Sequence, residues 1–184
     1  MIQYVYSNAI EDLKQILSLQ AANLAPALQE GEAETEGFVT IHHDLKLLED
    51  LGKEYPHTLA KDGEQVVGYA LSMPPSCAHT IEILIPMFDA INASIYKGQS
   101  LKEASYMVMG QICIDKAYRR QGIFRQLYQS MSDLLRGEVD YIITEVSSRN
   151  ERSLQAHLAV GFEILDQHEE EGKRWITIIL PLNQ

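Results

Sequence analysis

Residues 112–125 read ICIDKAYRRQGIFR, and this stretch contains the strongest structural signal in the sequence. An apolar run ends at Ile114, a short polar loop follows, and a helical pattern begins directly after Gly122. The first turn of a helix offers unpaired backbone N–H groups and the positive end of the helix dipole, which suit phosphate oxygens. Gly122 lets the backbone approach such a ligand closely. The stretch therefore predicts a strand, a pyrophosphate-binding turn and a helix; the alternative is a solvated basic helix start.

The charge of the whole chain makes these residues stand out. The 184 residues include 15 Lys and Arg and 26 Asp and Glu, a formal net charge of −11. Four of the cations fall within residues 116–125, namely Lys116, Arg119, Arg120 and Arg125. Binding to nucleic acid or to an anionic membrane surface depends on clustered positive charge, so the acidic balance disfavours both partners. We expect the acidity to serve solubility.

Length and composition favour a single domain over residues 1–184. A chain of this size buries about 70% of its extended surface and needs no disulfide or metal to fold. Cys77 and Cys113 are the only cysteines, and they form no metal-type spacing. The sequence contains neither an apolar run of about 18 residues nor a signal-peptide pattern at its start. A cytoplasmic protein is the expectation.

The periodicity of apolar residues extends the prediction outward from this stretch. The first half of the chain is expected to form a strand at 2–6, a helix after the capping pair Asn8 and Glu11, a helix from after Thr40 to Gly52, and a hairpin at 58–73 with its turn at 61–64. The second half is expected to form a strand at 106–114, a helix at 121–136, a strand at 141–146 and an Asn150-capped helix ending at Gly161. A final strand pair is expected at 162–165 and 175–180, with an exposed tip that includes 168–171. This order indicates an α+β (mixed α/β) fold with one central sheet.

Residues 76–104 form a segment too long for an ordinary strand connection. Its apolar part predicts a helix around Met87 to Tyr96. Two interpretations of this segment remain: a lid over a functional site, or an insertion that packs for stability or dimerisation.

Several other chemistries lack their motifs. The sequence has no P-loop, no Rossmann fingerprint, no H-E-x-x-H and no G-x-S-x-G. Adjacent His42 and His43 on a helix point about 100° apart, which disfavours a shared metal. We therefore predict no metal site.

The sequence RRQGIF, residues 119–124, resembles the [Q/R]-x-x-G-x-[G/A] acetyl-CoA signature of the GCN5-related N-acetyltransferases. A second block, EVSSRN at 145–150 followed by Ser153 and by His157 to Phe162, resembles the strand, Asn-capped helix and Gly-Phe end of that family. The resemblance implies a mostly antiparallel sheet of six to seven strands flanked by about four helices, with 76–104 inserted between the third and fourth strands.

The resemblance also implies an activity. Family members transfer an acetyl group directly from acetyl-CoA to an amine, so we expect an N-acetyltransferase acting on a primary amine of a small molecule or peptide. A catalytically degenerate acyl-CoA-binding sensor or interaction module is the alternative, and transfer of another acyl group or to an oxygen acceptor is a third. Dimers are common in this family, so a homodimer is possible.

By the same resemblance, the cofactor site is expected to include two groups of residues. Backbone groups of Ile112, Cys113 and Ile114 would pair with the pantetheine arm as an added strand does. The remaining expected contacts are Arg119, Arg120, Gln121, Gly122, Ile123, Phe124 and Arg125 at the pyrophosphate, and Asn150 and Ser153 on the next helix. Phe124 departs from the signature, which has Gly or Ala there, and binding requires its ring to turn toward the core.

The catalytic assignments are less direct. His157 stands where many members have a tyrosine that protonates the leaving thiolate, and its alternative is a hydrogen-bonded, half-buried side chain. Gln111 stands near the position of the family's glutamate base and cannot accept a proton. Glu145 on the next strand is the substitute, acting directly or through water, unless it only anchors the sheet.

The amine acceptor is expected to lie between residues 23–40, the 76–104 segment and the last strand pair. Residues 30–36 are acidic, with Glu30, Glu32, Glu34 and Glu36, so a cationic amine such as a polyamine is conceivable.

Overall fold

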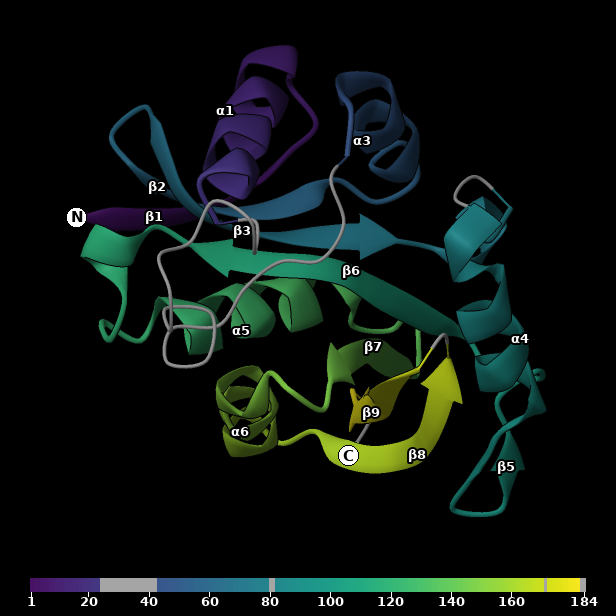
Figure 1. Ribbon diagram of the computed structural model, residues 1–184. Coiled ribbons are helices and arrows are strands. Elements are labelled where there is room, and N and C mark those ends of the chain that lie inside the picture. Colours follow the sequence, from purple (N-terminus) through teal and green to yellow (C-terminus); the bar gives the residue numbers. More distant parts are fainter. Residues whose placement is uncertain (24–42, 80–81, 171, 183–184) are drawn as a thin grey trace.

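A computed structural model describes residues 1–23, 43–79, 82–170 and 172–182 (Figure 1). Seven strands form one sheet in the order β1-β2-β3-β6-β7-β9-β8. They are β1 (Ile2–Ser7), β2 (His57–Asp62), β3 (Gln65–Met73), β6 (Tyr106–Ile114), β7 (Tyr141–Ser147), β8 (Glu163–Glu170) and β9 (Lys173–Pro181). Neighbouring strands are antiparallel except β6 and β7, which are parallel. The expected α+β fold with a mostly antiparallel sheet is confirmed.

Five α-helices are present in the described part of the chain, where about four were expected. They are α1 (Ile10–Ala21), α3 (Leu45–Leu51), α4 (Ile85–Ala93), α5 (Ile123–Leu135) and α6 (Glu151–Val160). Helices α1 and α3 cover one face of the sheet, and α5 and α6 lie against the other (Figure 1). Leu13 and Ile16 of α1 pack on Leu59 and Tyr69, while Leu127 of α5 belongs to a separate core.

The start of α1 differs from the predicted capping box. Ala9 is the N-cap residue, and no side chain caps it. Asn8 instead donates from Nδ2 to the Glu49 carbonyl at 3.3 Å, and Ser7 Oγ accepts from the Ala9 amide at 3.1 Å. The helix predicted to start after Thr40 is α3, which Asp44 caps through the Leu47 amide at 2.8 Å. The acidic residues of 30–36 lie outside the described residues.

The segment 76–104 contributes to the core. After the short 3-10 turns η2 (Pro75–Cys77) and η3 (Glu82–Leu84) come α4 and a small hairpin of β4 (Ile95–Tyr96) and β5 (Gln99–Ser100). The predicted helix is therefore shorter at its end, because Tyr96 lies in β4. Phe88 and Ile91 of α4 pack with Val108 and Ile143 of the sheet. These contacts support the packing interpretation of the segment.

Candidate functional site

The sheet opens between β6 and β7. The two strands pair at Tyr106↔Tyr141, Met107↔Ile142 and Val108↔Ile143 and form no ladder beyond this point. Thr144 then donates from Oγ1 to the Met109 carbonyl at 2.8 Å. β6 stays paired with β3 as far as Gly68↔Ile114, so the far half of β6 presents its other edge to the opening. A strand edge of this kind can pair with an extended ligand.

A bulge in β6 reorients the residues at the opening. Ala70 pairs with Ile112, but Ser72 pairs with Met109, so β6 holds one extra residue around Gly110. Such a bulge changes which side chains face each side of the sheet. Cys113 packs with the α1 core, whereas Ile112 packs against the α5 core.

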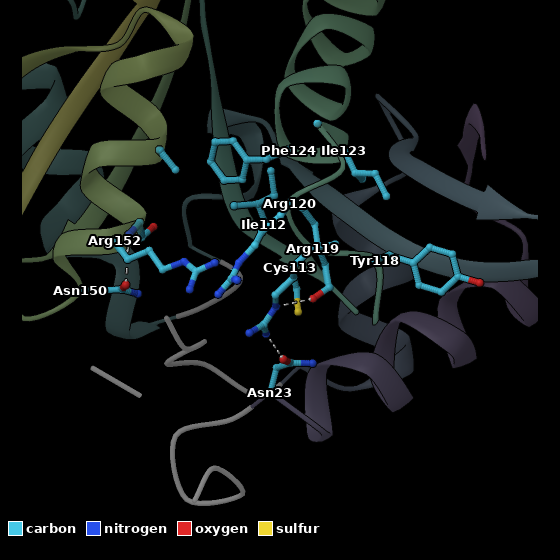
Figure 2. Close-up of a pocket in the computed structure, with 14 residues that line it drawn as sticks. Asn23, Ile112, Cys113, Tyr118, Arg119, Arg120, Ile123, Phe124, Asn150 and Arg152 are labelled. Atoms are coloured by element: carbon cyan, nitrogen blue, oxygen red, sulfur yellow. Dashed lines mark hydrogen bonds between the residues drawn. The ribbon is translucent and has the colours of Figure 1, made fainter. Parts of the chain in front are cut away.

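A pocket of about 230 Å³ lies at this opening (Figure 2). Ten of the expected cofactor residues line it: Ile112, Cys113, Ile114, Arg119, Arg120, Gly122, Ile123, Phe124, Asn150 and Ser153. Asn23, Tyr118, Arg152 and Ala156 line it as well and were not predicted. Gln121, Arg125, Glu145 and His157 are absent from the lining.

The turn before α5 has the conformation expected of a close approach to a ligand. Gly122 is the N-cap residue at φ +80, and a Cβ atom placed there would meet no atom within 4 Å. The first backbone bond of the helix runs from the Gln126 amide to the Gly122 carbonyl at 3.2 Å. The amides of residues 123–125 therefore lack intrahelical acceptors, and no side chain caps them. They form a donor set that fits phosphate oxygens.

Three arginines line the pocket beside this turn. Arg119 donates from Nε to the Ile114 carbonyl at 3.3 Å and from Nη2 to Asn23 Oδ1 at 2.7 Å, which ties the turn to the end of α1. Arg120, at φ +63, and Arg152 of α6 point toward one another across the pocket (Figure 2). Their positive charge complements a pyrophosphate.

Two residues that were expected to contact the pyrophosphate have side chains directed elsewhere. Arg125 donates from Nη2 to the Ala159 carbonyl at 2.7 Å, near the end of α6. Gln121 donates from Nε2 to the Ala117 carbonyl at 3.2 Å. Because each side chain has a carbonyl acceptor elsewhere, the contacts expected of these two residues depend on their backbone amides, and the Arg125 amide belongs to the donor set.

The start of α6 completes the pocket. Asn150 Oδ1 accepts from the Ser153 amide at 3.2 Å, which confirms the predicted N-cap. Arg152, Ser153 and Ala156 line the pocket from one face of this helix. Helical spacing from Ser153 is a signal that could have identified Ala156, whereas Asn23 comes from a distant element that no local pattern connects to the turn.

Phe124 lies between the pocket and the core. Its ring lines the pocket and meets the rings of His157 and Tyr128 edge-on, at centroid distances of 5.0 and 5.3 Å. The side chain thus continues into the aromatic core, and the space above Gly122 stays open.

The His157 ring does not fit the expected role of acid. It is 1% exposed, and its Nδ1 lies 2.7 Å from the Ser153 carbonyl oxygen. Since a carbonyl only accepts, Nδ1 carries the proton, and Nε2 accepts from Tyr128 Oη at 2.7 Å. Burial lowers the pKa of His157 to about 4, against the opposing effect of the Ser153 bond. The ring is neutral at pH 7 with its proton directed into its own helix, so the hydrogen-bonded alternative describes it.

Gln111 is buried in a polar network beneath the pocket. Its Oε1 accepts from Tyr69 Oη and from Gln20 Nε2, each at 2.6 Å. Gln20 Oε1 accepts from the His43 amide at 2.8 Å, which sets the orientation of the Gln20 amide. Its Nε2 therefore also donates to His43 Nδ1 at 2.7 Å. Burial raises the pKa of the neighbouring Cys113 thiol to about 12, so it stays protonated and is a poor nucleophile.

Glu145 lies on the face of the sheet that α1, α3 and α4 cover. Its Oε1 accepts from Thr177 Oγ1 at 3.1 Å and lies 3.5 Å from His168 Nε2. His168 was expected at an exposed hairpin tip. It lies within β8 instead, with its side chain folded back over β9 toward Glu145.

Neither metal-binding clusters nor membrane-spanning helices are found in the described residues. Nowhere in the described ranges do three or more His, Cys, Asp or Glu side chains gather as metal ligands would. None of the helices there has both the length and the apolar character needed to span a bilayer.

The fold and pocket define an α+β protein in which a turn lined by arginines lies beside an opened pair of parallel strands. The model of the Acetyltransferase (GNAT) family matches residues 19–162, and the chain belongs to this family. No curated protein matches it in sequence.

Solved structures share the fold at low identity. The ribosomal-protein-S18-alanine N-acetyltransferase of Escherichia coli aligns with a TM-score of 0.67 at 14% identity, over 100% of this chain and 96% of that one. Ard1 of Thermoplasma volcanium aligns with a TM-score of 0.66 at 14% identity, over 100% of this chain and 99% of that one. YncA of Salmonella typhimurium, solved with its cofactor acetyl-CoA, aligns with a TM-score of 0.62 at 14% identity, over 100% of this chain and 95% of that one.

Proposed function

We propose that the chain transfers an acetyl group from acetyl-CoA to a primary amine of a small molecule or peptide. The observation that carries this proposal is the pocket at the β6–β7 opening, where an uncapped helix start, a glycine at positive φ and three arginines meet a strand edge. Two similar folds support the ligand and the acceptor: YncA was solved with acetyl-CoA, and the Escherichia coli enzyme acetylates an alanine.

The residues at the pocket fit acetyl-CoA. The amides of residues 123–125 would receive pyrophosphate oxygens, with Arg119, Arg120 and Arg152 adding positive charge. The edge of Ile112 to Ile114 would pair with the pantetheine arm. When bound, acetyl-CoA supplies the acetyl group as a reactive thioester. An amide of the same strand edge would polarise the thioester carbonyl, as an oxyanion hole does.

A pair of glycine variants tests the site. Gly122 and Gly137 have nearly equal positive φ, +80 and +82, and a Cβ atom on either meets nothing within 4 Å. The two substitutions Gly122→Glu and Gly137→Glu therefore carry similar backbone strain. Only Gly122 lines the pocket, so only Gly122→Glu should weaken acetyl-CoA binding, by about tenfold or more through repulsion of phosphate.

The measurement is calorimetric titration of wild type and both variants with acetyl-CoA and with CoA. Micromolar binding by wild type and by Gly137→Glu, with loss in a folded Gly122→Glu protein, supports the site. Equal affinity in all three would remove it. Acetyl-CoA binding without CoA release in the presence of butylamine, spermidine or a tripeptide with a free N-terminus would favour the sensor alternative.

A further inference from the structure

The pocket at the β6–β7 opening has an apolar wall in addition to its arginines. Phe124, Ile112 and Ala156 line it, and they come from three different elements, α5, β6 and α6. Phe124 and Ile112 are both partly buried and pack against the same core. A half-buried aromatic ring at a pocket can bury its remaining area against an apolar group that enters. The wall therefore indicates a ligand with an apolar part next to its anionic part.

The aromatic core fixes the Phe124 ring. The ring meets His157 edge-on at a centroid distance of 5.0 Å and an interplanar angle of 87°, and it meets Tyr128 at 5.3 Å and 62°. Those two rings are held in turn, because Tyr128 Oη donates to His157 Nε2 at 2.7 Å and His157 Nδ1 lies 2.7 Å from the Ser153 carbonyl oxygen. A side chain that is already ordered loses little conformational entropy when a ligand binds.

The place of Phe124 in the turn limits which part of acetyl-CoA its ring can reach. The backbone amide of Phe124 belongs to the donor set of residues 123–125, so a phosphate bound there would lie beside the same residue. Two units flank the pyrophosphate of CoA. One is the ribose with its adenine, and the other is the pantoyl unit, which begins the pantetheine arm and has a carbon with two methyl groups.

The direction of the ring favours the pantoyl unit. The Phe124 side chain extends toward His157 of α6, and Figure 2 shows its ring apart from the guanidinium groups of Arg120 and Arg152. Ile112, the second member of the wall, lies on the strand edge that would pair with the pantetheine arm. The arginines thus suit the phosphates, and the wall lies on the side where the arm would enter the opening.

We propose that Phe124 is a specificity-determining residue for the cofactor and that its ring packs against the two methyl groups of the pantoyl unit. This inference rests on the proposed function, because it takes acetyl-CoA as the ligand. It gives a sign to the effect of the bulky side chain at this turn: the ring adds a contact and does not block the site. Replacement of Phe124 by alanine should therefore weaken CoA binding.

The first test removes each side of the proposed contact in turn. Calorimetry compares wild type and Phe124→Ala with CoA and with desdimethyl-CoA, an analogue in which hydrogens replace both pantoyl methyl groups. Phe124→Ala should bind CoA about tenfold more weakly than wild type, and wild type should bind desdimethyl-CoA about tenfold more weakly than CoA. The two changes together should cost little more than either alone, because both remove the same contact.

Phe162→Leu is the matched control for disturbance of the aromatic core. Phe162 meets Tyr128 and His157 at centroid distances of 5.0 and 5.2 Å, much as Phe124 does. It is 3% exposed and is absent from the pocket lining. Phe162→Leu should lower the free energy of unfolding and leave the affinity of the folded protein for both ligands unchanged.

The second test does not depend on the alanine variant. Proton NMR of the CoA complex should show nuclear Overhauser contacts between the pantoyl methyl groups and the Phe124 ring. These signals are assigned to Phe124 by their loss in Phe124→Leu, which keeps an apolar side chain at the position and disturbs the core less than alanine does.

The outcomes separate this inference from the proposed function. Tighter CoA binding by Phe124→Ala, fully additive losses with the two ligands, or pantoyl methyl groups without contacts to the Phe124 ring would each overturn the assignment of Phe124 alone. An equal loss of CoA affinity in Phe162→Leu would do the same, because the effect would then come from the core. Failure of wild type to bind acetyl-CoA and CoA would overturn the cofactor of the proposed function and this inference with it.

Discussion

At the scale of single residues, His157 and His57 are buried in neutral form. The His157 ring is surrounded by Phe124, Tyr128 and Phe162 at centroid distances of 5.0, 5.4 and 5.2 Å. His57 contacts the Leu48 carbonyl through Nε2 at 3.0 Å, and its Nδ1 accepts from the Ser72 amide at 3.2 Å. Burial lowers the pKa of each ring from 6.5 to about 4.

These shifts predict a loss of stability in mild acid. The unfolded chain takes up protons on these histidines near pH 6.5, whereas the folded chain does so only near pH 4. The stabilisation is therefore complete above about pH 6.5 and is lost as pH falls toward 4, by roughly 3 kcal/mol for each ring.

Denaturant unfolding at several pH values between 7.5 and 4.5 measures how steeply the free energy of unfolding falls with pH. His157→Asn should be less stable than wild type at pH 7.5 by about 1–3 kcal/mol, because Tyr128 Oη loses its acceptor. It should also lose stability less steeply on acidification, since one of the two rings no longer titrates. His79→Asn is the control, because His79 is exposed. If the free energy of unfolding of His157→Asn fell with pH as steeply as that of wild type, the assignment of a buried neutral His157 ring would be contradicted.

Local patterns predicted some of these residues and not others. The roles of Gly122 and Asn150 at helix starts depend on a few adjacent residues, so the sequence was sufficient for both. His157 takes its hydrogen bond from Tyr128, 29 positions away, and Arg125 donates to Ala159, 34 positions away. Side-chain direction at such positions is decided by tertiary partners, which periodicity does not report.

At the scale of elements, the β6–β7 opening could not be read from the sequence. Apolar periodicity predicted both strands, and its bounds were close to those of β6 and β7. The opening depends on where pairing stops and on the extra residue of β6 near Gly110. Both are properties of register between strands far apart in the chain, and a single strand pattern does not contain register.

Thr144 marks the point where the opening begins, and a matched pair of Thr→Val variants tests its role. Thr144 donates to the Met109 carbonyl, while Thr58 Oγ1 is buried with no partner. Thr144→Val should cost about 1–2 kcal/mol of unfolding free energy and weaken acetyl-CoA binding several-fold, because the last link between the strands is lost. Thr58→Val should be neutral or stabilising and leave binding unchanged.

Denaturant unfolding and calorimetry on both variants measure these effects. If Thr144→Val matched Thr58→Val in both quantities, the hydroxyl link would have no part in shaping the opening.

At the scale of the whole molecule, the 76–104 segment supports the end of the sheet where β6 and β7 are still paired. Tyr106 donates from Oη to Asn92 Oδ1 at 3.0 Å, and α4 packs on Val108 and Ile143, both members of the paired region. The pocket lies past the other end of that pairing, and its lining includes no residue of the segment. A structural role therefore accounts for these contacts better than a lid does.

Two isoleucines four positions apart test this division of roles. Ile91 of α4 is 1% exposed, and Ile95 of β4 is 70% exposed. Ile91→Ala should cost about 2–5 kcal/mol of unfolding free energy by leaving a cavity, while Ile95→Ala should change it by less than about 0.5 kcal/mol. Neither should alter the acetyl-CoA affinity of the folded protein, measured by calorimetry well below the melting temperature. A segment that acts only on stability leaves the binding constant of the folded state unchanged. Weaker acetyl-CoA binding by folded Ile91→Ala would therefore show that the segment is coupled to the pocket, and it would restore the lid interpretation.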